Sequence, residues 1–94
     1  MITVDFLSLP IVTKAIGARS VTMDFTGQTV RDLIGDLTRR FGPKVHDFLT
    51  DDDGHLDLSI RVQLNGAAWI YHDRLDHPLT DGDHVTLMML VGGG

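Results

Sequence analysis

The sequence predicts a small α+β domain in which a mixed sheet of four to five strands carries one main helix across one face. Two observations favour this class. Short segments that alternate strictly between apolar and polar residues, the period of a half-buried strand, occur near both ends and in the middle of the chain. A single longer segment between them has the period of an amphipathic helix. A chain of 94 residues is long enough for one such domain and too short for two.

The first two strands are expected to form a hairpin. Ile2–Phe6 and Val21–Phe25 both alternate, so each has one apolar face. Pro10 and Gly17 lie between them and favour an irregular segment. We therefore expect a loose connection with a mobile tip between the two strands.

The helical segment has well-defined ends. Apolar residues recur at helical spacing from Val30 to Phe41. Thr29 is placed to cap the helix N-terminus, and Asp32, three residues on, completes a capping box. Gly42 and Pro43 then predict the stop.

The second half of the chain reads as short elements separated by turns. Two alternating segments predict strands, and a third apolar triplet predicts a short edge strand. In order, the expected elements are a helical turn at Val45–Leu49, a loop at Asp51–Gly54, a strand at Ile60–Leu64, a turn at Asn65-Gly66, an edge strand at Trp69–Tyr71, a tight turn at Leu79–Asp83 and a final strand at His84–Leu90.

This order of elements describes a β-grasp domain. One helix cannot cover both faces of a sheet, so it is expected to pack on one. We expect residues 1–90 to form this single domain and residues 91–94 a flexible C-terminal glycine tail. The apolar positions expected to face the helix are Ile2, Val4, Phe6, Val21, Met23, Phe25, Ile60, Val62, Leu64, Val85, Leu87 and Met89.

Composition excludes several classes of function. The formal net charge is −5, which disfavours a general nucleic-acid partner, because such binding needs clustered Lys and Arg. No apolar run approaches the roughly 18 residues of a membrane span, so no membrane partner is expected. Asp5 interrupts the first apolar segment, which disfavours a signal peptide. Zero cysteines exclude disulfides and thiolate chemistry and are compatible with a cytoplasmic protein.

No motif predicts a metal site or an enzyme active site. The acidic run Asp51–Asp57 lacks the glycine and glutamate that an EF-hand would need at Leu56 and Val62, so a solvated loop is favoured. The histidines have no ligand spacing, and no nucleophile elbow surrounds Ser8 or Ser20. We expect no metal site and no catalytic residue.

The chain stops at Val91-Gly92-Gly93-Gly94, directly after a hydrophobic strand. Three glycines cannot contribute to a core. They can form a thin arm of at most about 10–14 Å beyond Val91. Such an arm could enter a narrow cleft and present its α-carboxylate there, because glycine has no side chain. The alternative is a frayed terminus.

The order of the expected elements and the glycine ending of the chain together resemble the ubiquitin-like sulfur-carrier family. This family includes the thiamin-pathway carrier and the small subunit of molybdopterin synthase. The resemblance extends over essentially the whole chain. It rests on the first strand, the helix Thr29–Phe41, the Asn65-Gly66 turn and above all Leu75–Gly94. There, Pro78–Val85 followed by an apolar strand and glycines is similar to the family's "pLxDGDeV…GG" ending.

The resemblance implies a protein co-substrate that is not itself an enzyme, although it could be the small subunit of one. A separate E1-like adenylyltransferase uses ATP and Mg²⁺ to adenylate the terminal carboxylate, here that of Gly94, and a thiocarboxylate then forms. A second, sulfur-accepting biosynthetic enzyme receives the sulfur. Gly92 and Gly93 would let the tail thread both active sites, and no cofactor is stably bound.

The ending departs from the family pattern in two ways. Family members often have prolines where Met89 and Leu90 stand, and they usually end in two glycines, whereas this chain has three. Either Gly94 is the reactive end, or the natural chain ran further and was cut, which would move the reactive glycine.

A docking surface is expected beside the tail. If the first and last strands run parallel in the sheet centre, Leu7, Met88 and Leu90 point away from the helix and, with Val91, form an apolar patch for partners. The alternative places Met88 or Leu90 in the core. Arg61 and Gln63 share that face and could make rim contacts.

Three functions remain open. The first is a sulfur carrier. The second is a ubiquitin-like modifier conjugated through its terminal glycine, and the third is a β-grasp interaction domain with an inert tail. The receiving pathway is also open, because molybdopterin, thiamin, cysteine and thiolated tRNA routes all use carriers of this build.

Overall fold

A computed structural model describes residues 1–89 of the chain. Five strands, three α-helices and one 3₁₀ helix follow one another along these residues. In chain order they are β1 (Ile2–Leu7), α1 (Pro10–Ile16), β2 (Ser20–Met23), α2 (Val30–Phe41), α3 (Pro43–Leu49), β3 (Ile60–Leu64), β4 (Ala68–Ile70), η1 (His72–Arg74) and β5 (His84–Met89).

The strands form one mixed sheet in the order β2-β1-β5-β3-β4. β1 and β5 are parallel neighbours at its centre, and every other pair is antiparallel. The predicted β-grasp architecture is therefore confirmed, including the parallel pairing of the first and last strands. This pairing matters for function because β5 leads into the C-terminal residues.

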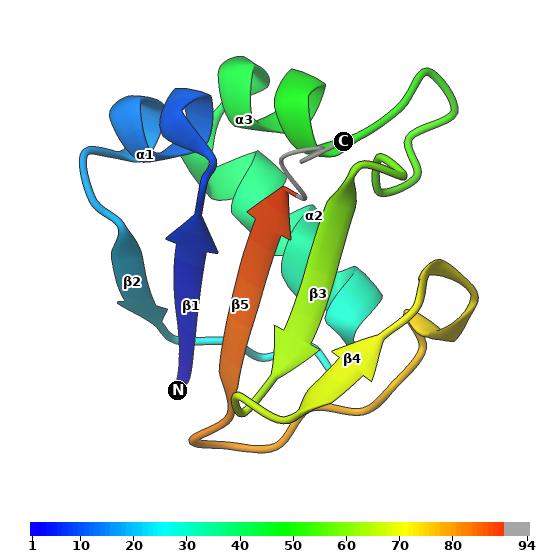
Figure 1. Ribbon diagram of the computed structural model, residues 1–94. Helices are drawn as coiled ribbons and strands as arrows, with labels where there is room; N and C mark the ends of the chain where they lie inside the picture. The colour runs from blue at the N-terminus through cyan, green and yellow to red at the C-terminus, as the bar shows by residue number, and fades with distance from the viewer. Residues whose placement is uncertain (90–94) are drawn as a thin grey trace.

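All three α-helices lie on one side of the sheet or at its end (Figure 1). α2 crosses one face, and the shorter α1 and α3 lie together near the ends of β1 and β5. Within residues 1–89, no α-helix covers the opposite face. Between α2 and the sheet lies a core of buried apolar side chains, which includes Val4, Leu33, Leu37, Val62 and Leu87.

The capping box of α2 is formed as predicted. The Thr29 hydroxyl accepts a hydrogen bond from the Asp32 amide, and the Asp32 carboxylate accepts from the amides of Gln28 and Thr29. These bonds to the ionised form hold the pKa of Asp32 below its ordinary value. The box satisfies amides that a helix N-terminus otherwise leaves unpaired.

The expected loose connection between the first two strands is wrong. It contains α1, which begins at Pro10, ends at the left-handed Gly17 and buries Val12. Leu9, just before the helix, is also buried. Proline fits the first helical turn and glycine the C-terminal cap, so both residues taken as loop signals are helix boundaries here.

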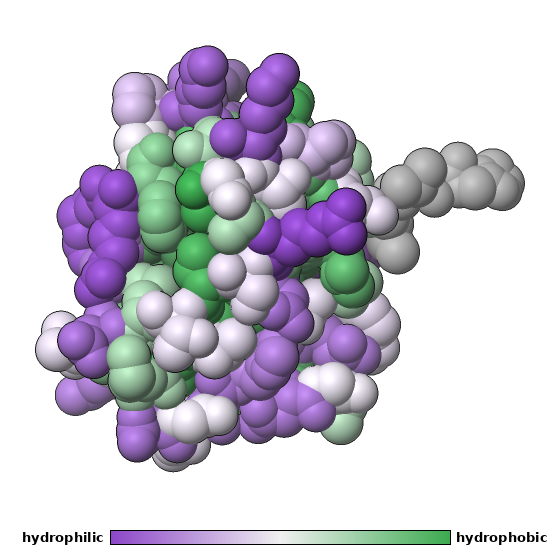
Figure 2. Space-filling view, turned by 90° about the vertical axis from the view of Figure 1, so that its left-hand side faces the viewer, coloured by the Kyte–Doolittle hydropathy of each residue, from purple (hydrophilic) through white to green (hydrophobic). Residues whose placement is uncertain are grey.

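The expected helical turn at Val45–Leu49 is a longer helix, α3, which begins at Pro43 because proline fits the first helical turn. The remaining strands and turns lie close to the predicted positions. Asn65 and Gly66 both have positive φ, as a tight hairpin turn between β3 and β4 requires. Figure 2 shows the side formed by α1 and β2, where apolar surface is a narrow strip between hydrophilic side chains. No helix within residues 1–89 has the length and apolar character needed to cross a bilayer.

Candidate functional site

The uncovered sheet face is the candidate site, because it borders the strand that leads to the terminal glycines. Side chains alternate along a strand, so residues between the core positions point to this face. Leu7 of β1 pairs in register with Met88 of β5. Leu7 is 52 % exposed and Met88 is half-buried. Neither is a fully buried core residue, so two of the predicted docking residues form adjacent apolar surface.

The other predicted site residues lie outside the described part of the chain. Leu90 and Val91 follow β5 directly, and Gly92, Gly93 and Gly94 complete the sequence. Their roles in docking, threading and activation stay predictions.

The centre of the open face is polar. His84 Nε2 lies 2.5 Å from the Asp5 carboxylate, across the β1–β5 pair. A hydrogen bond from the Ser20 hydroxyl lowers the pKa of Asp5, and the bond and charge of His84 add to this, while partial burial opposes it. This pair has no local signal in the sequence, because 79 positions separate the two residues.

Arg61 and Gln63 lie on the same face, as expected. Arg61 pairs in register with Met88, and Gln63 pairs with Thr86 of β5 and with Trp69 of β4. Both side chains are half-buried. Trp69 is 45 % exposed and does not pack into the core. The face therefore runs from an apolar pair at β1–β5 to an arginine and aromatic residues at the β4 edge.

The Thr80–Asp83 turn has a structural role. The Asp83 carboxylate accepts hydrogen bonds from the Thr80 amide and the Asn65 side chain, and both bonds lower the pKa of Asp83. The Asn65 side-chain oxygen in turn accepts from the amide of His84. The family-like "DGD" motif thus locks the turn before β5 to the β3–β4 hairpin, and so sets where β5 begins.

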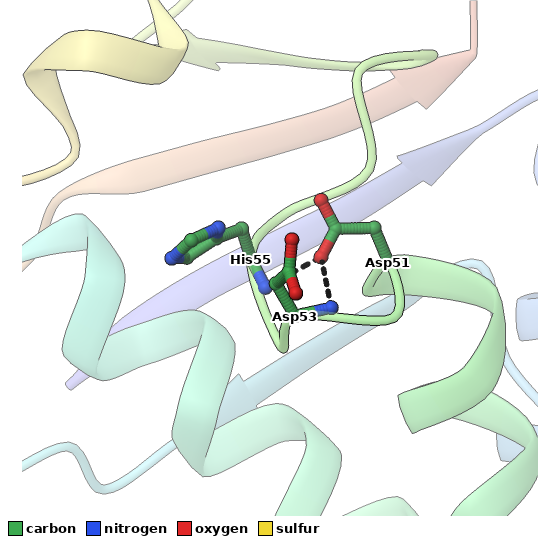
Figure 3. Close-up of side chains that lie close together, drawn as sticks. All are labelled: Asp51, Asp53 and His55. Atoms are coloured by element: carbon green, nitrogen blue, oxygen red, sulfur yellow. Dashed lines mark hydrogen bonds between the residues drawn. The ribbon is translucent and has the colours of Figure 1, made fainter.

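One group of metal-ligating side chain types occurs within residues 1–89: Asp51, Asp53 and His55 (Figure 3). Their ligand atoms lie within 4.8 Å of one another, and all three residues are exposed. One Asp51 oxygen already accepts bonds from the amides of Asp53 and His55. This arrangement explains the shape of the loop, which is solvated as the sequence predicts.

The chain is similar to known proteins in sequence and in fold. The sequence model of the ThiS family matches residues 12–94 and so extends through the terminal glycines. The chain belongs to the ThiS family. ThiS-family proteins are small ubiquitin-like sulfur carriers or modifiers rather than enzymes. A comparison with curated proteins found no match.

Solved structures similar to this ThiS-family chain cover its whole length. SAMP1 from Haloferax volcanii is 28 % identical with a TM-score of 0.77, over 99 % of this chain and 98 % of that one. The crystal structure of the BexX/CysO complex from Amycolatopsis orientalis contains a chain that is 27 % identical to this one. The two chains superpose with a TM-score of 0.75 over 100 % of both. Urm1 from Trypanosoma brucei is 26 % identical with a TM-score of 0.73, over 99 % of this chain and 94 % of that one.

Proposed function

We propose that this chain is a sulfur carrier that works through its C-terminal glycine. The observation that carries the proposal is the ThiS-family match, which runs through Gly94. An E1-like enzyme with ATP and Mg²⁺ adenylates the Gly94 carboxylate and releases pyrophosphate. Sulfide then displaces AMP and leaves a thiocarboxylate. A persulfide instead displaces AMP to give an acyl disulfide, and a thiol then reduces its S–S bond to release the thiocarboxylate. Adenylation is needed because a free carboxylate has no good leaving group.

The carrier's own contribution is positional. β5 lies in the sheet centre between β1 and β3 and is the last described element before the tail. Gly92 and Gly93 offer no side chain to obstruct a narrow active site. The apolar pair Leu7 and Met88, with Leu90 and Val91, supplies the docking surface for the activating enzyme. The sulfur-accepting enzyme uses the same tail in a second step.

Intact mass measures the proposed reaction directly. The purified chain is incubated with ATP, Mg²⁺, a sulfur donor and its host's E1-like enzyme. We expect a mass gain equal to replacement of one oxygen by sulfur. The matched control lacks Gly93 and Gly94 and should keep the native circular dichroism spectrum while showing no gain. An unchanged mass for the full chain, with an enzyme shown to be active, leaves only an interaction domain with an inert tail.

A modifier function is the second candidate, and the likeness to SAMP1 and Urm1 favours it. Both functions share the activation step and differ in the acceptor. Adding the activated chain to a host lysate separates them. Conjugates joined through Gly94 to lysine side chains indicate a modifier, whereas transfer of sulfur with release of the free carboxylate indicates a carrier.

Docking through the apolar pair is tested by Leu7→Ser. Leu7 is exposed, so the substitution should leave the fold unchanged while it removes apolar contact area from the interface. We expect the KM for the carrier in ATP–pyrophosphate exchange to rise about tenfold, which corresponds to about 1.4 kcal/mol. Leu58→Ser is the matched control, because Leu58 is exposed but lies in the loop before β3. Equal KM values for the two variants would place docking elsewhere.

A further inference from the structure

A small cavity opens where β3 and β4 separate. The two strands pair as far as Val62 and Ile70, after which the chain turns from Tyr71 into η1. His72 Nε2 lies 3.0 Å from the Asp57 carbonyl oxygen. The cavity has a volume of about 240 Å³ and is lined by Arg61, Val62, Trp69, Ile70, Tyr71 and His72. We call it the fork pocket.

The Arg61 side chain has a donor without an acceptor. Its Nε is shielded from solvent and donates no hydrogen bond among the described residues. Within residues 1–89, Arg61 also forms no ion pair with a carboxylate. A buried donor left unpaired is destabilising, and native chains rarely retain one without a use for it. The guanidinium is always charged, so the pocket carries one uncompensated positive charge.

Aromatic side chains flank this arginine. Trp69 and Tyr71 are the only tryptophan and tyrosine of the chain, and they are 45 % and 62 % exposed. Tryptophan, tyrosine and arginine are the residue types that most often dominate binding energy at protein interfaces. Their gathering around a cavity, on a chain with few aromatic residues, marks this edge as a contact surface.

The fork pocket is continuous with the proposed docking surface. Arg61 pairs with Met88, and Met88 pairs with Leu7, so one row of residues connects the pocket to the apolar pair. A protein that docks on Leu7 and Met88 therefore lies one strand away from Arg61 and can cover the pocket in the same interface. The inference below therefore rests on the proposed function for the identity of the partner.

We infer that the fork pocket receives the carboxylate of an aspartate or glutamate side chain from the enzyme that activates the C-terminus. A carboxylate gives the Arg61 guanidinium the ionic partner that it lacks among the described residues. Because Nε is shielded, the two terminal nitrogens make the contact, and their planar arrangement suits two parallel hydrogen bonds to one carboxylate. The flanking aromatic rings exclude water from the pair once the partner is in place. Among the described residues, Arg61 is the only permanently charged one that lines the pocket, so a singly charged carboxylate fits better than a doubly charged phosphate.

The pocket's preference can be tested without the enzyme. The ¹⁵N-labelled full chain is titrated with the peptide acetyl-Gly-Glu-Gly-amide, and acetyl-Gly-Gln-Gly-amide serves as the uncharged control. The signals followed are the Arg61 Nε–H and the Trp69 indole N–H. We expect the Glu peptide to shift both signals saturably and the Gln peptide to shift neither. Equal shifts from both peptides, or no shift from either, would overturn the carboxylate assignment.

A truncated chain tests whether the pocket is filled from within. In a variant that lacks Gly92, Gly93 and Gly94, we expect the Arg61 Nε–H signal to stay where it is in the full chain. A shift on truncation, together with peptide binding in the truncated chain alone, would show that the chain's own C-terminus occupies the pocket and would overturn the inference.

The role in docking is tested with the host's E1-like enzyme by ATP–pyrophosphate exchange. Arg61→Met keeps the apolar stem of the side chain and removes the charge, and we expect the KM for the carrier to rise about tenfold with kcat within twofold. Arg39→Met is the matched control, because Arg39 is exposed on α2 and away from the open face. A KM like that of the wild type would overturn the inference.

Two further measurements distinguish failure of this inference from a structural role of Arg61 and from failure of the proposed function. Because Arg61→Met removes an unpaired donor, its midpoint of thermal unfolding should equal or exceed that of the wild type, and a large decrease would indicate a structural role instead. If the wild-type chain supports no exchange at all, the proposed function fails. The peptide titration then still decides whether the pocket binds a carboxylate.

Discussion

Two glycines near α2 differ in what a side chain would meet. A Cβ added at Gly27 would lie 2.6 Å from the Phe25 ring and 2.7 Å from Asp32 Cβ. A Cβ added at Gly35, in the interior of α2, would have no heavy atom within 4 Å. Glycine is thus needed for close approach at one position, whereas at the other it only weakens the helix.

Opposite effects of alanine are expected at the two glycines. Gly27→Ala should lower the free energy of unfolding by about 1–3 kcal/mol, because Phe25 or the start of α2 must move. Gly35→Ala should raise it by about 0.5–1 kcal/mol through helix propensity. Urea titration of both variants measures these changes. Destabilisation by Gly35→Ala would contradict the open space that the structure shows beside Gly35.

The elements of this chain divide into those specified locally and those specified by packing. α2 has a capping box, an apolar stripe and a glycine stop within its own sequence. α1 has seven residues and no side-chain cap, and a helix this short is unstable alone. Its stability must come from Leu9 and Val12, which are buried against the rest of the core.

Substitution in the β1–β2 connection distinguishes a packed helix from a loose loop. Leu9→Ala should lower the free energy of unfolding by about 2–5 kcal/mol, as expected for a fully buried leucine. Ile11→Ala is the control, because Ile11 is 52 % exposed and its loss should change stability by no more than about 0.5 kcal/mol. Chemical denaturation measures both. Similar small effects would contradict the packing of α1.

At the scale of the whole molecule, the two faces of the sheet have different roles. One face is buried under α2 and holds the core. The other brings together the Leu7–Met88 pair, the Asp5–His84 pair and the fork pocket along strands that lead toward the C-terminus. The core and the proposed docking surface therefore lie on opposite sides of the same strands.

The stability of the molecule should fall in acid. Hydrogen bonds lower the pKa values of Asp5, Asp32, Asp57 and Asp83 in the folded protein. A carboxyl group whose folded pKa is depressed contributes stability above its unfolded value, near 3.9, and this contribution is lost as the pH falls through the folded value. The free energy of unfolding from urea titrations should thus decrease from about pH 5 to about pH 2. Asp83→Asn should flatten this decrease, and an unaltered slope would contradict the role of Asp83 in the turn.

Much of the fold could be predicted from sequence because its signals are local. The alternation of apolar and polar residues specified the inward faces of β1 and β3. The capping residues specified both ends of α2. Leu7 and Met88 could be placed on the open face once the parallel pairing of the end strands was assumed. The glycine ending and the turn before β5 carried the family resemblance, since both are contiguous motifs.

Only the tertiary structure decided which distant residues meet. Asp5 and His84 lie at opposite ends of the chain and are joined by the β1–β5 register. Arg61 becomes a charged group without an acceptor only because β4 leaves β3 beside it and Trp69 and Tyr71 close around it. Periodicity and caps act within one element, whereas strand register and the point where two strands part depend on the packing of the whole chain. The sequence by itself therefore determined the family resemblance and most of the elements, whereas the packing of the whole chain decided that α1 forms and which side chains meet on the open face.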